Sequence, residues 1–155
     1  MKTCIVGSRS LVLDGNVAIH LLYTLQELYE HDRRERVGPD VTSILARPER
    51  VILRQPLHLP VRPFEALTST LAESLGLGVD WFAPEPGGRA KVFLRDVEMV
   101  QAADQVIAFF PDGDEMTGGT GHVVEKALDQ KKPVRAYAVA GTELRLIGSE
   151  DWSEG

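Results

Sequence analysis

A glycine-rich segment that directly follows an apolar run is the feature that most constrains the fold of this chain. Residues 105–110 are mostly apolar and predict a buried β-strand. After a short loop, residues 117–121 read Thr-Gly-Gly-Thr-Gly, and apolar residues at helical spacing follow them. These apolar residues are Val123, Val124, Ala127 and Leu128. The predicted order is therefore strand, glycine-rich loop, helix.

This segment has the properties of a phosphate-binding loop. Glycines allow positive φ angles and a close approach of the main chain to a ligand, and a helix that begins there directs free N–H groups and the positive end of its dipole at an anion. Glu125 lies one turn inside the helix, within reach of such a ligand. The alternative is that the glycines only form a flexible turn and cap the helix. The candidate phosphate-binding residues are Thr117, Gly118, Gly119, Thr120, Gly121 and His122.

The same residues resemble a family motif. The pattern Gly-Gly-x-Gly-Thr-x-x-Glu is typical of the Rossmann-like superfamily that contains the LONELY GUY, or lysine decarboxylase-like, phosphoribohydrolases. Related sensor domains that bind nucleotide-derived ligands belong to it as well. Gly118, Gly119, Gly121 and Glu125 match the pattern, and His122 stands where that family has threonine.

Two further stretches are similar to this superfamily. Residues 95–99, Arg-Asp-Val-Glu-Met, resemble its Arg-Lys-x-x-Met motif, with Asp96 in place of lysine. The first apolar run and the turn after it, which contains Gly7, Ser8 and Arg9, resemble the first strand and glycine turn of a bacterial and phage branch. A turn at the carboxyl end of a parallel strand is where open α/β sheets bind ligands, and an arginine there can hold a phosphate in a bidentate manner. The alternative for Arg9 is a solvated surface residue.

The resemblance implies a function and an assembly. Phosphoribohydrolases cleave the N-glycosidic bond of a nucleoside monophosphate, and the resemblance gives Glu125 and Arg95 the catalytic roles if this chain is an enzyme. A carboxylate suits this step because the transition state develops positive charge. Asp96 removes a lysine charge and His122 removes a phosphate-binding hydroxyl, so we expect ligand binding rather than turnover. Relatives with this loop commonly form dimers, so we expect a homodimer.

The rest of the chain predicts alternating strands and helices. Apolar stripes indicate helices over residues 12–31, 64–75 and 90–103. Short apolar runs indicate strands at 3–6, 51–53, 79–82 and 134–139, and residues 143–147 alternate as an antiparallel edge strand does. We therefore predict an α/β fold: a Rossmann-like three-layer sandwich with a mainly parallel sheet of about five strands and helices on both faces. Residues 1–148 form one domain, and we expect residues 149–155 to be a mobile acidic tail.

Residues 31–50 and 55–63 fit this pattern less well. Residues 31–50 are charged and poorly periodic, which predicts a surface excursion with at most a short helical turn. Residues 55–63 contain three prolines where the phage and bacterial branch has a second glycine-rich turn. A proline-rich loop offers few N–H donors, so either the ligand is held differently or half of the pocket is lost. His58 and Arg62 are candidates to replace the missing donors; otherwise they are exposed loop residues.

Composition restricts the partners. A net charge of −6 and a pI near 5.2 argue against general binding to DNA or RNA, which needs a concentrated basic surface. No apolar run is long enough to span a membrane and no secretory signal is recognisable, so we expect a cytoplasmic location. The single cysteine, Cys4, is expected to be a small buried hydrophobe, and the four histidines lie too far apart for metal-ligand spacing. We expect neither a metal nor a cofactor.

Three hypotheses follow for the function of the chain. The first is a binding or sensor domain for a nucleotide or a related sugar phosphate. The second is an active nucleoside 5′-monophosphate phosphoribohydrolase. The third is a degenerate scaffold that serves partner interaction, suggested by the missing second glycine turn. The base or sugar that is recognised cannot be read from the sequence.

Overall fold

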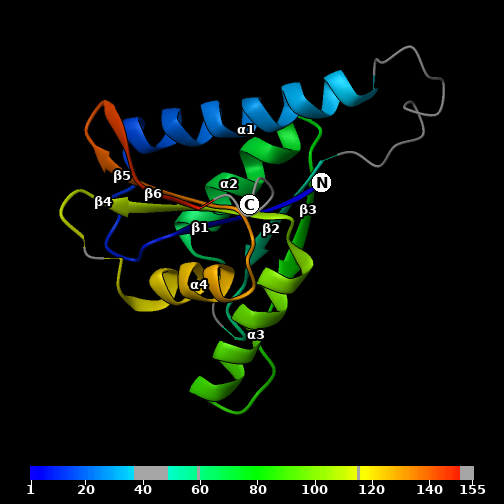
Figure 1. Ribbon diagram of the computed structural model, residues 1–155, viewed down its shortest axis with the longest axis vertical. Helices are drawn as coiled ribbons and strands as arrows, with labels where there is room; N and C mark the ends of the chain where they lie inside the picture. The colour runs from blue at the N-terminus through cyan, green and yellow to red at the C-terminus, as the bar shows by residue number, and fades with distance from the viewer. Residues whose placement is uncertain (37–48, 59, 115, 151–155) are drawn as a thin grey trace.

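A single twisted sheet forms the centre of the molecule (Figure 1). The computed structural model describes residues 1–36, 49–58, 60–114 and 116–150. In these residues the sheet has six strands in the order β3-β2-β1-β4-β5-β6. Strands β1 to β5 are parallel, and β6 pairs antiparallel with β5, as the alternating pattern of residues 143–147 predicted. The strands are β1 (Lys2–Gly7), β2 (Arg50–Arg54), β3 (Gly78–Phe82), β4 (Gln105–Pro111), β5 (Val134–Ala140) and β6 (Glu143–Glu150).

Helices cover both faces of this sheet. The described helices are α1 (Gly15–Arg36), α2 (Pro63–Ser74), α3 (Arg89–Ala102) and α4 (Gly118–Asp129). In Figure 1, α1 and α2 lie on one side of the sheet and α3 and α4 on the other. The predicted three-layer α/β architecture is therefore confirmed. None of the helices in the described ranges is long and apolar enough to cross a membrane.

Side chains of β1 alternate between the two faces of the sheet, so this strand packs against both layers of helices. Ile5 packs into a cluster with Leu21 of α1, whereas Val6 packs into the opposite cluster with Met99 of α3. Successive side chains of a strand point to opposite faces, so a strand covered on both sides needs a continuous apolar run. The apolar run at residues 3–6 is therefore a requirement of the central position of β1.

The strand order creates a crevice between β1 and β4. The chain moves outward from β1 to β2 and β3, and then crosses to the other side of β1 to form β4. The connections that leave the carboxyl ends of β1 and β4 therefore diverge to opposite sides of the sheet, which opens a ligand crevice in folds of this type. Gly7 is paired with Phe109 at this edge, and the Ser8 amide donates to the Phe109 carbonyl at 3.0 Å.

Two predictions about the ends of elements need correction. Strand β6 continues to Glu150, and Ser149 pairs with Arg135, so the first two residues of the predicted tail belong to the sheet because β5 offers them main-chain partners. Residues 151–155 lie outside the described residues. Helix α1 continues to Arg36, five residues beyond its predicted end, and the greater part of the predicted surface excursion, residues 37–48, also lies outside the described residues.

Candidate functional site

A cavity of about 720 Å³ lies at the carboxyl edge of the sheet, beside the crevice between β1 and β4. The turn after β1, the end of β2, one side of α3 and the first turn of α4 all contribute to its wall. It is lined by Ser8, Arg9, Ser10, Arg54, Arg62, Arg89, Val92, Phe93, Arg95, Asp96, Asp114, Thr117, Gly118, Gly119, Thr120 and His122. The segments around residues 8, 95 and 118 that the sequence singled out therefore meet at one cavity.

The glycines at the start of α4 serve different purposes. Gly118 is the first residue of the helix and has a φ of 75°, which L side chains rarely adopt. A Cβ on Gly121 would lie 1.9 Å from the carbonyl oxygen of Met116, so only glycine permits the loop to fold back on the helix. A Cβ on Gly119 would meet only Arg54 Nη1, at 3.5 Å. Gly119 thus leaves room beside the cavity, whereas Gly121 is required by the fold of the loop.

The amides of the first turn of α4 are available to a ligand. Thr117 is the N-cap residue with an extended backbone, but its side chain makes no capping hydrogen bond. Asp114 Oδ1 accepts from the amides of Met116 (2.9 Å) and Thr117 (3.4 Å), which precede the helix. Gly118, Gly119 and Thr120 follow them on the wall of the cavity. An N-terminal turn without a side-chain cap, beside a cavity, suits an anion.

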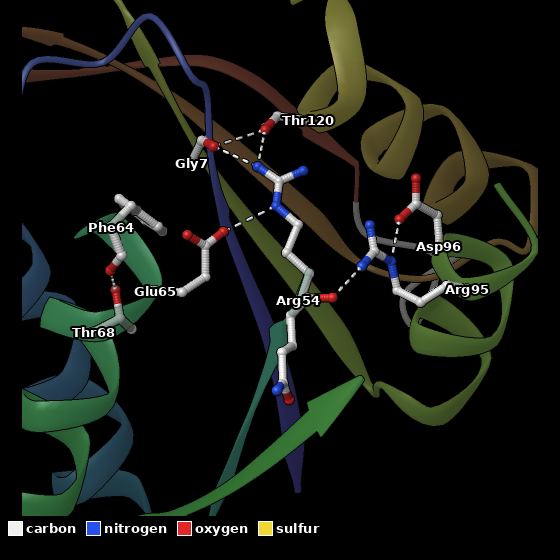
Figure 2. A network of polar contacts seen from close by, with 9 residues as sticks. Gly7, Arg54, Phe64, Glu65, Thr68, Arg95, Asp96 and Thr120 are labelled. Atoms are coloured by element: carbon white, nitrogen blue, oxygen red, sulfur yellow. Dashed lines mark hydrogen bonds and ion pairs between the residues drawn. The ribbon is translucent and has the colours of Figure 1, made fainter. Parts of the chain in front are cut away.

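Arg54 ties three elements together beneath this turn (Figure 2). Its Nε donates to Glu65 Oε1 of α2 at 3.0 Å, and its Nη2 donates to the Gly7 carbonyl and to Thr120 Oγ1 at 2.6 Å. Thr120 Oγ1 also donates to the Gly7 carbonyl at 2.9 Å. Within the described residues Nη1 makes no hydrogen bond, and it lies beside Gly119. Arg54 therefore fixes the floor of the cavity and leaves one donor group free.

Arg95 and His122 share the carboxylate of Asp96. Arg95 Nε donates to Asp96 Oδ1 at 2.9 Å, and His122 Nδ1 lies 2.9 Å from Asp96 Oδ2. A carboxylate can only accept, so Nδ1 carries the proton in this contact. Arg95 Nη1 also donates to the Gln55 carbonyl at 3.0 Å, and the His122 ring contacts that of Phe93 with centroids 4.4 Å apart. Asp96, which is 2% exposed, thus orients both basic side chains at the cavity.

The cavity carries an excess of positive charge. Five arginines and two aspartates line it. Glu65 neutralises Arg54 and Asp96 neutralises Arg95, but Arg9, Arg62 and Arg89 have no ion pair within the described part of the chain. Partial burial lowers the pKa of Arg62, and the positive charges of Arg9 and Arg54 lower this pKa further. The arginines therefore repel one another, and an anion between them relieves that repulsion.

Some predicted site residues serve the fold rather than the cavity wall. Gly7 is buried, its carbonyl is occupied by Arg54 and Thr120, and a Cβ on it would lie 2.6 Å from the Phe64 ring. Gly121 is not among the lining residues. Glu125 is exposed and does not line the cavity either. The candidates Ser8, Arg9, Arg95, Thr117, Gly118, Gly119, Thr120 and His122 do line it.

Sequence reasoning missed Arg54 and Arg89 and left Arg62 undecided between donor and exposed loop residue. The rule that placed Arg9 at the site, a position at the carboxyl end of a parallel strand, also applies to Arg54, the last residue of β2. Arg62 directly precedes Pro63, the first residue of α2, so the proline-rich segment brings Arg62 to the cavity, while His58 is exposed and does not line it. No comparable signal marks Arg89, which begins α3 after Gly88.

A larger cavity lies away from this site. A cavity of about 1070 Å³ lies near the opposite edge of the sheet, beside Gln105 and Arg135 at the amino ends of β4 and β5. Glu27 and Glu30 contribute negative charge to its lining, and a helix N-terminus is not among its lining residues. The smaller cavity therefore has the better chemistry for an anion. No group of His, Cys, Asp or Glu in the described ranges could hold a metal ion.

Comparisons with protein-family models, with curated proteins and with solved structures find no match to this chain. The fold and the site define an α/β protein with a cationic cavity at the carboxyl edge of its parallel strands. The chemistry of that cavity is therefore the best guide to what the protein binds.

Proposed function

We propose that this protein binds a small phosphorylated molecule, a nucleotide or a sugar phosphate, in the 720 Å³ cavity. The observation that carries the proposal is the meeting of unpaired arginines with the uncapped first turn of α4. A helix N-terminus offers main-chain donors, and guanidinium groups offer the planar, bidentate donors that match a phosphate. Both kinds of donor line one cavity of a size usual for small ligands.

The cavity is positively charged although the whole chain is negative, and this difference in charge supports specific binding of an anion. The chain has a formal net charge of −6, yet the lining has five arginines against two aspartates. Repulsion among Arg9, Arg54 and Arg62 persists without a ligand, which is a cost that a merely structural cluster would not require. The buried pairs of Arg54 and Arg95 hold their guanidinium groups in place before a ligand arrives, so little ordering is needed on binding.

Binding without turnover is the function that we favour. Glu125, to which the family resemblance assigns catalysis, is exposed and outside the lining of the cavity. Arg95 is engaged by Asp96 and by the Gln55 carbonyl. These positions support a sensor or binding domain over a phosphoribohydrolase. Incubation with a panel of nucleoside monophosphates, followed by chromatography for free base, tests this choice, and we expect no release above the uncatalysed rate.

Calorimetric titration tests the binding proposal. Inorganic phosphate, ribose 5-phosphate and AMP are titrated at low ionic strength, and at least one is expected to bind. Arg62→Gln and Arg9→Gln are each expected to weaken that binding by about three- to tenfold, since each removes a charge-assisted hydrogen bond. Arg135→Gln is the matched control, because it removes the same charge near the opposite edge of the sheet. Absence of binding by all three compounds contradicts the proposal and favours the scaffold hypothesis.

The resemblance also leads us to propose a homodimer. Sedimentation equilibrium over a tenfold range of protein concentration tests it directly. A mass of one chain, 17.1 kDa, throughout that range contradicts the dimer but leaves the binding proposal intact.

A further inference from the structure

A smaller, second cavity lies next to the cationic one. It has a volume of about 310 Å³ and lies between the proline-rich segment after β2 and the turn after β3. Arg9, Arg54, Arg62, Val92 and Arg95 line both cavities. The two cavities are therefore neighbours, so a ligand bound in one can extend towards the other.

The lining that belongs to the second cavity alone is largely apolar. Pro56, Leu57 and Pro60 line one part of it, and Pro84 from the turn after β3 lines another. Proline has no N–H, so three of these four residues give the ligand no main-chain donor. The glycine-rich turn that the family resemblance led us to expect at this position would instead have offered main-chain donors.

The main-chain groups of Gln55 and one carboxylate oxygen of Glu65 are engaged by the protein, whereas Glu65 Oε2 is buried without a hydrogen-bond partner among the described residues. The Gln55 amide donates to the Phe82 carbonyl at 2.8 Å, and the Gln55 carbonyl accepts from Arg95. Glu85 lies 3.8 Å from Lys91, and Glu65 is paired with Arg54. Away from the shared arginines, the cavity therefore offers a ligand mainly carbon surface, which favours an uncharged apolar group over a second phosphate.

We infer that the ligand is a phosphate ester whose ester group is apolar and about the size of one ring, with the phosphate on the arginine side and the ring against Pro56, Leu57 and Pro60. This inference rests on the phosphate site of the proposed function, and it favours an apolar ester group over the nucleotide or sugar named there. A volume of 310 Å³ is at the low end for ligand cavities, so it accommodates one part of a ligand rather than a separate molecule. The proline-rich segment then serves as a rigid apolar wall, and the pocket at this position is changed rather than lost.

Phenyl phosphate is the probe that tests this inference. We expect it to bind about tenfold tighter than inorganic phosphate, because burial of a ring adds favourable transfer free energy that is partly offset by ordering. Ribose 5-phosphate, whose ester group is polar, is expected to bind no tighter than inorganic phosphate. Titration calorimetry of the full chain measures all three.

Variants locate the ring. Leu57→Asn, at a partly exposed position where folding is tolerant, is expected to bring the affinity for phenyl phosphate to within about threefold of that for inorganic phosphate. Val92→Thr, which keeps the shape of the side chain and replaces a methyl group by a hydroxyl, is expected to act in the same direction. Leu146→Asn makes the same change at an exposed residue of the edge strand β6 and is the control.

The outcomes separate this inference from the proposal on which it rests. Binding of inorganic phosphate without a preference for phenyl phosphate overturns the apolar subsite and leaves the phosphate site standing, whereas no binding of either compound overturns both. A preference that survives in Leu57→Asn and in Val92→Thr also overturns the inference. A shift in sedimentation by Leu57→Asn, with unchanged phenyl phosphate affinity, assigns this surface to a second copy of the chain instead.

Discussion

Asp96 and His122 are in direct contact, with Asp96 Oδ2 2.9 Å from His122 Nδ1. Together they form a pair between α3 and α4, and Asp96 binds Arg95 as well. Asp96 therefore couples α3 to α4 and holds two basic side chains at the cavity.

This coupling predicts a non-additive pair of substitutions. Asp96→Asn leaves Arg95 without its buried carboxylate and is expected to lower the free energy of unfolding by about 3 kcal/mol. His122→Asn is expected to cost less, because the His122 side chain is 18% exposed. The loss of stability in the double variant is expected to be smaller than the sum of the two single losses by about 0.5 kcal/mol or more, as for residues in contact. Urea unfolding of the four proteins measures this coupling, and strict additivity contradicts it.

A nearby carboxylate provides the control for that cycle. Glu98 is exposed on the same helix as Asp96. Glu98→Gln is expected to change the free energy of unfolding by less than about 0.5 kcal/mol, alone and together with His122→Asn. A loss as large as that of Asp96→Asn would mean that the helix responds to net charge rather than to the specific contact.

The glycines of α4 predict opposite effects of the same substitution. Gly121→Ala places a methyl group 1.9 Å from the Met116 carbonyl oxygen, so we expect a loss of at least about 2 kcal/mol in the free energy of unfolding. Gly119→Ala meets only Arg54 Nη1 at 3.5 Å and is expected to be neutral or to stabilise by up to about 1 kcal/mol, since alanine favours a helix. Thermal unfolding followed by circular dichroism compares them. Equal melting temperatures would contradict the assigned roles.

Arg54 is predicted to act through the geometry of its guanidinium rather than through its charge alone. Lysine at this position keeps the charge but cannot reach Glu65, Gly7 and Thr120 together. Arg54→Lys is therefore expected to lower the free energy of unfolding by about 3 kcal/mol. Arg135→Lys, which alters a partly exposed pair with Glu27, is expected to cost less than about 0.5 kcal/mol. Equal losses in denaturant unfolding would show that the network beneath the cavity contributes little.

The sequence was sufficient to predict which segments form the sheet and which form the helical layers of this fold. Strands buried on both faces, such as β1 and β4, are short apolar runs, and helices covered on one face show an apolar stripe, so the two patterns differ in period. The ends of elements were harder to predict. Helix α1 continues into a charged segment and β6 into an acidic one, where pairing and helix propagation outweigh the composition.

The cavity was predictable in part. Main-chain features such as the glycine turn leave a local signal, because only glycine fits those positions. Arg54 lies at the carboxyl end of β2, where the rule that placed Arg9 at the site would also have placed it, whereas no local pattern marks Arg89 at the start of α3. Glu125 was placed at the site by its spacing from the glycines, but the rotation of α4 leaves it exposed, while Val123 and Val124 pack into the core.

Cys4 gives a prediction that depends on pH. It is buried in β1, and burial raises the pKa of its thiol from an ordinary 9.0 to about 12, although the positive charge of Arg54 opposes the shift. Well below pH 9 the thiol is protonated in both the folded and the unfolded protein, so the shift has no effect on stability there. Between pH 9 and about 12 only the unfolded state ionises, so this group lowers the free energy of unfolding as pH rises, by at most about 1.4 kcal/mol per pH unit.

Two measurements check this prediction. Iodoacetamide at pH 8.5 is expected to leave Cys4 of the folded protein unmodified and to alkylate it in urea, because the thiolate is the reactive form and the folded protein suppresses it. Urea unfolding at pH 8 and pH 10 is expected to show a smaller fall in stability for Cys4→Ala than for the unchanged protein, since the other titrating groups are common to both. An equal fall in the two proteins would show that the thiol ionises as readily in the folded state as in the unfolded chain, and that the space around Cys4 between β2 and β4 admits water.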